Sequence, residues 1–352
     1  MVKFTQLFVA TVLGVFGVTS ALPQSNPSSP PKRDTASCTD PIQRKPWSQL
    51  TSEEHSGYLN ATLCLMSLPA TLGIDDRAES RWDELQWAHI KQTNWMHSNG
   101  HFLPWHRYYV TVHAHMLRDE CGYTGSIPYW DEPTDATLTH LNESVMFQSD
   151  GFGGDGVLLD GDTATIDKCV RDGPFVNQTL RLWYNTSDTT EYCIYRNLSD
   201  TALPSGITQT DVDACMTYDN YTAAWECFAG TIHGQGHSAV KGVMGHVANA
   251  PGDPMFFLHH TWLDAMWWKW QSLNLTSRLT DIGGPVMPSS SFLSRNTAMG
   301  TPGAEYLDYD GDDGNVTTLN HVLWMVGVAE NVTVAEVMDV GGGVVCAEYV
   351  YY

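Results

Sequence analysis

Histidine clustering is the feature that most restricts how this chain can fold. Of its 14 histidines, most fall in two stretches. The first stretch is WAHIKQTNWMHSNGHFLPWHRYY, with His89, His97, His101 and His106. The second joins TIHGQGH to the later DPMFFLHHTWL, with His233, His237, His259 and His260. A structural role explains a single buried histidine well. Metal binding explains two dense groups better, because each neutral imidazole offers a nitrogen lone pair.

Spacing within the second stretch narrows the possibilities. His233 and His237 are four residues apart, so a helix places both on one face. His259 and His260 point about 100° apart on a helix, so only one of them faces a given site, and spacing alone does not choose between them. Histidine groups without nearby thiolates or carboxylates suit copper, zinc, iron or nickel. Zinc peptidases place a glutamate directly after the first histidine of such a pair; Gly234 stands there instead, which argues against a metallohydrolase.

The charge balance excludes two classes of partner. The chain of 352 residues has 18 basic and 40 acidic side chains, a formal net charge of -22. Such a surface repels phosphate backbones and anionic lipids, so we expect no nucleic acid or membrane partner. The same charge favours a soluble monomer. Hydrophobic residues make up 42% of the chain, enough to bury a sizeable core.

The N-terminal region has the pattern of a secreted protein. Lys3 precedes an apolar run over residues 4–18, and small residues follow at 19–21, which predicts a cleaved signal peptide over 1–21. A buried N-terminal helix is the alternative. Residues 22–36 are rich in Pro and Ser and predict a disordered leader, which the dibasic pair Lys32-Arg33 exposes to trimming. Residues 37–352 then form one domain.

Sequons and cysteines agree with secretion into the extracellular space. N-linked glycans are predicted from nine sequons, at Asn60, Asn142, Asn177, Asn185, Asn197, Asn220, Asn274, Asn315 and Asn331. Eight cysteines predict four disulfides in an oxidising compartment. Cys38 and Cys346 bracket the mature chain, so we expect a bridge near its two ends.

Local signals predict a mainly helical domain with long loops. The capping box Thr51–Glu54 predicts a helix to about Leu68, and Asp253-Pro254 predicts the start of another. Residues 140–222 are loop-rich. The other expected elements are helices over 76–96, from Pro104 to about Glu120 with a stop at Gly122, and from 254 to about 273, and a strand within 343–351.

Three motifs in this order resemble the type-3 copper proteins, the family of tyrosinases, catechol oxidases and hemocyanins. They are FLPWHRYY with His97 and His106, the stretch IPYWD at 127–131, and DPMFFLHH at 253–260 with Asp264 and Trp267. The resemblance covers about residues 45–275 and is strongest to short secreted fungal polyphenol oxidases. It implies a mainly α fold, an antiparallel four-helix bundle with long loops and few short strands. It also implies two copper ions and O2 as co-substrate.

The resemblance also assigns the metal ligands. Its first copper site corresponds to His89, His97 and His106, and its second to His233, His237 and His260. In the family the later member of the His-His pair binds the metal, so His259 is expected to support the site from outside. No ligand position matches the remaining histidines, of which four are interpreted as structural and three have no assigned role: His101, His113, His115 and His246, then His55, His140 and His321.

Two departures from the wider family concern the copper surroundings. Many members link a cysteine to the second ligand of the first site, but Trp95 stands where some fungal members carry it, so all cysteines remain free for disulfides. Several tyrosinases have Asn after the first ligand of the second site, where it holds a water together with a glutamate. Gly234 replaces that Asn, and Glu226 has only approximate spacing for the carboxylate. These residues favour oxidation of diphenols over hydroxylation of monophenols.

Further expectations concern substrate entry and ligand support. Val247 matches the position of a gate over the first copper, and its small size leaves room for bulky phenols; the alternative is a packed loop residue. Asp264, one turn after His260, is expected to accept a hydrogen bond from a metal-binding imidazole, unless it is an exposed helix carboxylate. Because 92 residues follow His260, fewer than a shielding domain needs, no C-terminal removal is expected before activity.

The predicted function is therefore O2-dependent oxidation of catechols to o-quinones by a copper polyphenol oxidase, with small phenols as substrates. Hydroxylation of some monophenols accompanies it in part of the family. Three alternatives remain: a full tyrosinase, a hemocyanin-like oxygen carrier, and a copper glycoprotein that has lost catalysis.

Overall fold

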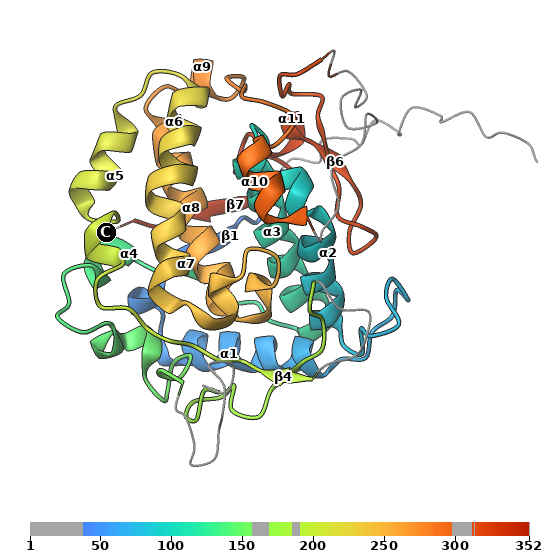
Figure 1. Ribbon diagram of the computed structural model, residues 1–352, viewed down its shortest axis with the longest axis vertical. Helices are drawn as coiled ribbons and strands as arrows, with labels where there is room; N and C mark the ends of the chain where they lie inside the picture. The colour runs from blue at the N-terminus through green and yellow to red at the C-terminus, as the bar shows by residue number, and fades with distance from the viewer. Residues whose placement is uncertain (1–37, 157–168, 185–190, 298–311, 313, 352) are drawn as a thin grey trace, which may run out of the picture. The chain divides into compact units, whose positions relative to one another are not determined.

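Two long helices, α3 (Phe102–Cys121) and α8 (Met255–Ser272), pack against each other in the interior, and each contributes many buried apolar side chains (Figure 1). The computed structural model describes residues 38–156, 169–184, 191–297, 312 and 314–351, all within the unit formed by 37–352. The predicted signal peptide, the leader with Lys32-Arg33 and the sequon at Asn185 lie outside these residues.

Helices α1 (Ser52–Ser67) and α2 (Arg81–Met96) pack against α3 and against each other. The predicted capping box at Thr51 is confirmed, because the Glu54 N–H donates to the Thr51 hydroxyl. A second capping box at Ser80 starts α2 later than the predicted residue 76. Helix α3 begins at Phe102, two residues before the expected Pro104, and ends at Gly122, whose φ of 68° is left-handed.

A continuous helical run leads into the second histidine stretch. It consists of α6 (Tyr221–Cys227), a π-helical turn over Phe228–His233, and α7 (Gly234–Val240). The π turn packs against α8 and widens the helix by one residue per turn. Helix α8 starts one residue after the predicted Pro254, and the Asp253 carboxylate accepts a hydrogen bond from the Met255 N–H. The N-cap is therefore Pro254 and not the predicted Asp253, which lies one residue earlier and still accepts from the first helical N–H.

A small parallel sheet joins the two ends of the described chain. Its strand order is β2-β1-β7, formed by Ile127–Tyr129, Ile42–Pro46 and Ala347–Tyr349. Residue Arg44 pairs with Ile127 on one side and with Tyr349 on the other. The expected strand within 343–351 is therefore confirmed, although it is shorter than the predicted range.

The remaining elements are short. They are α4 (Glu132–Asp135), α5 (Gln209–Met216), α9 (Leu275–Arg278), α10 (Ser290–Arg295), α11 (Val334–Val337), and the strand pairs β3 (Thr179–Leu180) with β4 (Tyr192–Cys193) and β5 (Val322–Leu323) with β6 (Val332–Thr333). The fold is mainly helical, as predicted. The antiparallel four-helix bundle stays a prediction.

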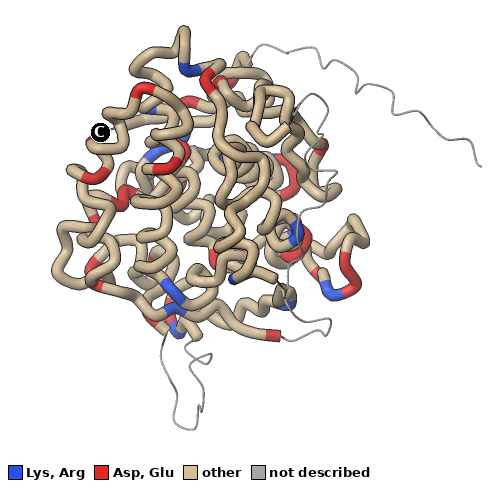
Figure 2. The backbone as a smooth tube through the Cα atoms, turned by 45° about the horizontal axis from the view of Figure 1, so that its top comes forward, with Lys and Arg blue, Asp and Glu red and all other residues tan. Residues whose placement is uncertain are grey.

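All eight cysteines form disulfides, as the even count predicted. The pairs are Cys38–Cys346, Cys64–Cys121, Cys169–Cys193 and Cys215–Cys227. The expected bridge between the chain ends is confirmed, and no cysteine remains for a bond to a histidine. Acidic positions are spread along the described backbone and outnumber basic ones (Figure 2). Within the described residues, no helix combines the length and apolar character needed to cross a bilayer.

Candidate metal centre

The first histidine group is assembled from both sides of the turn between α2 and α3. His89 lies on α2, His97 directly follows that helix, and His106 lies on α3. All three are buried, and one ring nitrogen from each lies within 4.8 Å of the others. The sequence prediction that these residues meet is confirmed.

Backbone carbonyls fix the orientation of these three rings. The Nδ1 atoms lie 3.0 Å from Ala248 O for His89, 3.0 Å from Thr93 O for His97 and 2.8 Å from Phe102 O for His106. A carbonyl only accepts, so each Nδ1 carries the proton and each Nε2 keeps its lone pair. The Nε2 atoms of His89 and His106 are buried and have no hydrogen-bond partner among the described residues. This is the arrangement that a metal ligand requires.

The second group combines the π turn, α7 and α8. His233, His237, His259 and His260 place one ring nitrogen each within 4.8 Å of one another. The carbonyl of Met244 accepts from His237 Nδ1 at 2.8 Å, and the Nε2 atoms of His237 and His233 lie 3.1 Å apart. The predicted pairing of residues four apart on a helix is thus confirmed.

His259 and His260 differ in their surroundings. Nδ1 of His259 lies 2.5 Å from Glu132 Oε1 on α4, and both side chains are fully buried. Burial raises the pKa of Glu132 well above its usual range and lowers the pKa of His259 to about 3. Burial therefore disfavours the charged form of each member of this pair. Both ring nitrogens of His260, in contrast, have no hydrogen-bond partner among the described side chains.

The two groups adjoin each other. The rings of His106 and His260 stack with centroids 4.2 Å apart and an angle of 12° between their planes. Phe256, one turn before His260 on α8, contacts both groups: its ring lies 4.1 Å from His260 and 5.0 Å from His89. The geometry is that of a site for two neighbouring ions.

Burial keeps these imidazoles unprotonated. Desolvation lowers the pKa of every histidine in both groups below the ordinary 6.5, and the pKa of His97 and of His237 falls to about 3. A metal competes with protons for the same lone pair. The pocket therefore offers neutral nitrogen donors at any pH near neutrality, the donor set that copper prefers.

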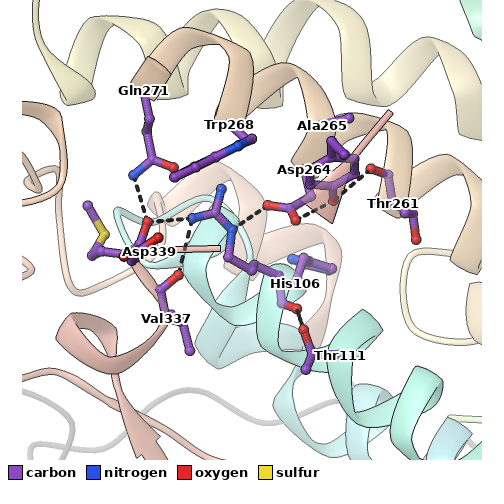
Figure 3. Close-up of polar contacts among 12 residues, drawn as sticks. His106, Thr111, Thr261, Asp264, Ala265, Trp268, Gln271, Val337 and Asp339 are labelled. Atoms are coloured by element: carbon purple, nitrogen blue, oxygen red, sulfur yellow. Dashed lines mark hydrogen bonds and ion pairs between the residues drawn. The ribbon is translucent and has the colours of Figure 1, made fainter. Parts of the chain in front are cut away.

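The predicted role of Asp264 is wrong. Its carboxylate is buried and binds Arg107 Nε at 2.5 Å, Arg44 Nη1 at 2.8 Å and the Tyr349 hydroxyl at 2.5 Å. In Figure 3 it points at the guanidinium whose other edge faces the carbonyl of Val337. Asp264 faces away from the imidazoles because two buried arginines need its charge, so it is neither an imidazole acceptor nor an exposed carboxylate.

The other candidate residues, Glu226, Gly234 and Val247, differ in their exposure and surroundings. Glu226 is exposed on α6 and is not part of either group of potential ligands. Gly234 follows His233, and a side-chain carbon added there would meet nothing within 4 Å. Val247 is half-buried and lines a hollow together with Phe292 of α10. Sequence reasoning missed Glu132, whose only signal was its place directly after the IPYWD motif.

Comparison with known proteins gives consistent results. The family model "Common central domain of tyrosinase" matches residues 79–273. Tyrosinase-like protein phomQ1' of Diaporthe leptostromiformis is 31% identical over 92% of this chain and 82% of its own length. N-acetyl-6-hydroxytryptophan oxidase ivoB of Emericella nidulans is 28% identical over 87% of this chain and 91% of its own.

Solved structures show the same fold. A polyphenol oxidase variant from Thermothelomyces thermophila superposes with a TM-score of 0.72 at 27% identity, covering 88% of this chain and 89% of that chain. A tyrosinase from Burkholderia thailandensis shares the fold with a TM-score of 0.55 at 18% identity, over 89% of this chain and 74% of its own.

Proposed function

Because this chain belongs to the tyrosinase family of type-3 copper oxidoreductases, we propose that it oxidises o-diphenols to o-quinones with O2. The observation that carries the proposal is the pair of adjoining histidine groups with buried, unpartnered ring nitrogens. In the net reaction, two catechols each lose two electrons and two protons, and one O2 is reduced to two waters.

The proposed ligands combine the two histidine groups of the structure with the family resemblance. His89, His97 and His106 hold one copper, and His233, His237 and His260 hold the other. The choice of His260 over His259 follows the family resemblance, because the Nε2 atom of His259 is also buried and unpartnered. His259 contacts Glu132 and packs against His233 with ring centroids 5.4 Å apart, which suits a supporting role. When bound, two copper ions supply the redox chemistry that couples phenol oxidation to O2 reduction.

The chain's own groups prepare this chemistry. Four backbone carbonyls hold the rings of the ligands His89, His97, His106 and His237 in one tautomer, so little reorganisation is needed on metal binding. The aromatic ring of Phe256 packs against both groups. The small side chain of Val247 lines the neighbouring hollow and leaves room there for a substrate.

Metal analysis and turnover test this proposal together. We expect two coppers per chain, an oxygen-dependent near-ultraviolet band, and O2 uptake with 4-tert-butylcatechol. The variant His260→Ala is expected to lose one copper, whereas the matched variant His259→Ala retains both. Absence of copper would contradict the proposal, and a band without turnover would favour oxygen carriage.

The preference for diphenols rests on Gly234. No carboxylate from Glu226 reaches the histidine groups, and no amide follows His233 to hold a water for phenol deprotonation. A side chain at 234 has free space, so Gly234→Asn folds normally and is expected to raise tyramine hydroxylation relative to catechol oxidation. Rapid tyramine hydroxylation by the unaltered protein, without a lag, would overturn this preference.

The gate proposed at Val247 has its own test. Because Val247 lines the hollow beside the first histidine group, Val247→Phe is expected to raise KM for bulky catechols and leave KM for catechol itself nearly unchanged. Equal effects on both substrates would contradict a gate.

Secretion is proposed from the N-terminal pattern, with a signal peptide over 1–21, a leader over 22–36 and a monomeric catalytic domain over 37–352. The four disulfides suit an oxidising compartment. All eight described sequon asparagines are exposed, which suits N-linked glycans: Asn60, Asn142, Asn177, Asn197, Asn220, Asn274, Asn315 and Asn331. N-terminal sequencing of the mature protein and its mass before and after glycosidase treatment test both points.

A further inference from the structure

A hollow of about 310 Å³ lies beside the first histidine group, between the loop at 245–248 and α10. Each of these two walls contacts one histidine of the first group. The carbonyl of Ala248 accepts from His89, and the ring of Phe292 lies parallel to that of His97, with centroids 5.9 Å apart and planes at 18°. The hollow is therefore lined by residues that directly contact His89 and His97.

Helix α10 is held in place at this wall. The Asn94 amide on α2 donates to the carbonyl of Asn296 at 2.9 Å, and the Asn296 amide donates to Phe292 O at 3.0 Å. Phe292 and Arg295 are three residues apart and so share one face of the helix. Both line the hollow, which places a flat aromatic surface and a cation side by side at the approach to the histidines.

The charge of this hollow contrasts with the rest of the chain. No acidic side chain lines it, although the chain carries 40 acidic residues against 18 basic ones. Arg295 is exposed, and no described carboxylate forms an ion pair with it. Other arginines near the surface do have such partners, for example Arg77 with Asp75 and Arg118 with Asp119. Among the described residues, the cation at this entrance therefore has no competing carboxylate.

A second hollow next to the first is also lined by aromatic residues and one basic residue. It shares Tyr184 with the first, measures about 590 Å³, and is lined by Trp87, Trp95, Lys91 and other residues, none of them acidic. Two neighbouring aromatic surfaces, each with one basic side chain, suit an aromatic molecule that carries a negative charge.

We propose that the preferred substrates are phenols with a carboxylate on a short side chain, whose carboxylate binds Arg295 while the ring packs against Phe292. A guanidinium matches a carboxylate in a two-point geometry. One cation balances one negative charge, and burial lowers the pKa of the nearby His246 so that it adds no second charge. A monoanionic carboxylate therefore fits better than a dianionic phosphate. This substrate class rests on the proposed diphenol oxidation.

Matched substrates test the assignment on the copper-loaded protein. We compare 3-(3,4-dihydroxyphenyl)propanoate with its amide, which has nearly the same shape and no charge, by O2 uptake. Arg295→Gln is expected to raise KM for the acid about fivefold to tenfold, with kcat and the amide's KM unchanged. Arg295→Lys is expected to restore part of the loss, because it keeps the charge without the two-point contact. Arg118→Gln removes an exposed arginine elsewhere on the protein and is expected to leave the KM of both substrates unchanged.

A second readout separates this inference from the proposed function. Calorimetric binding of 3-phenylpropanoate, which cannot be oxidised to a quinone, is expected to weaken in Arg295→Gln, whereas binding of 3-phenylpropanamide is not. An unchanged ratio of acid to amide KM in Arg295→Gln, with normal amide turnover, would overturn the role of Arg295. If neither catechol is oxidised by the unaltered protein, the proposed function fails, and the binding measurement still decides whether Arg295 recognises a carboxylate.

Discussion

Arg107 and Asp264 form a fully buried ion pair, with Nε 2.5 Å from Oδ1, that joins α3 to α8. Arg107 directly follows His106, and Asp264 lies one turn after His260, so the pair fixes the two helices whose histidine rings stack at 4.2 Å. Arg44 and Tyr349 bring the central sheet into the same network. The contact thus links the ends of the domain to the junction between the two histidine groups.

Asp264→Ala is expected to lower the free energy of unfolding by about 3–5 kcal/mol, because it leaves Arg44 and Arg107 buried without their counter-ion. Urea unfolding of both proteins measures the difference. Asp119→Ala removes an exposed partner of Arg118 and is expected to cost about 1 kcal/mol or less. Equal destabilisation by the two substitutions would contradict a central role for the buried pair.

The disulfide between Cys38 and Cys346 closes almost the whole described chain, with a sequence separation of 308. A cross-link of this length restricts the unfolded chain strongly, so replacing both cysteines by serine is expected to destabilise the protein by about 2–5 kcal/mol. The double substitution Cys215→Ser with Cys227→Ser opens a loop of only 12 residues and is expected to cost less. Thermal unfolding of the two double variants tests that order.

Sequence patterns predicted the features that depend on local signals. The capping box at Thr51, the stop at Gly122 and the spacing of His233 and His237 act within one or two helical turns, and the structure confirms each of them. The resemblance to a known family added the grouping of histidines that lie far apart in the chain.

Long-range contacts account for what the sequence did not reveal. Glu132 meets His259 across 127 residues and Asp264 meets Arg107 across 157, and no local pattern encodes either pairing. The turn position of Asp264 made an imidazole contact reasonable, but two buried guanidinium groups attract a carboxylate far more strongly than a neutral ring does. The π turn over Phe228–His233 likewise has no residue pattern that distinguishes it from an ordinary helical turn.

Burial of His113 makes the stability of the folded protein depend on pH, and one substitution can measure this contribution. It is buried against Phe257, with ring centroids 3.8 Å apart, and burial lowers its pKa from the ordinary 6.5 to about 3. As the pH falls below 6.5, the unfolded chain binds a proton that the folded protein refuses. The stabilisation is complete above pH 6.5 and is lost as the pH falls toward 3.

We therefore expect His113→Phe to reduce the slope of unfolding free energy against pH, between pH 6 and 4, by about 1.4 kcal/mol per pH unit. Urea unfolding over this range measures the slope, which is independent of any constant packing cost of the larger ring. His140→Gln serves as the control: Asp200 raises the pKa of this exposed histidine, so its contribution has the opposite sign and is lost as the pH rises. An unchanged slope in His113→Phe would show that this histidine is protonated in the folded protein.

The absence of a side chain at Gly236 is needed for the second histidine group. A carbon added there would overlap the His259 ring and lie 2.9 Å from Glu132 Oε2, and both of these groups are rigidly buried. Gly236→Ala is therefore expected to push His259 and the adjoining His260 out of place. The copper content should fall from two ions per chain to about one, as measured by atomic absorption.

Gly234→Ala provides the matched control, because it lies on the same short helix between the same two histidines and its added carbon meets nothing within 4 Å. It is expected to keep both coppers. The two substitutions have the same intrinsic effect on helix propensity, so a difference in copper content between them reports on the displacement of His259 and the adjoining His260. Full copper occupancy in Gly236→Ala would show that His260 keeps its place when His259 is displaced, which would contradict the expected disruption of the second site.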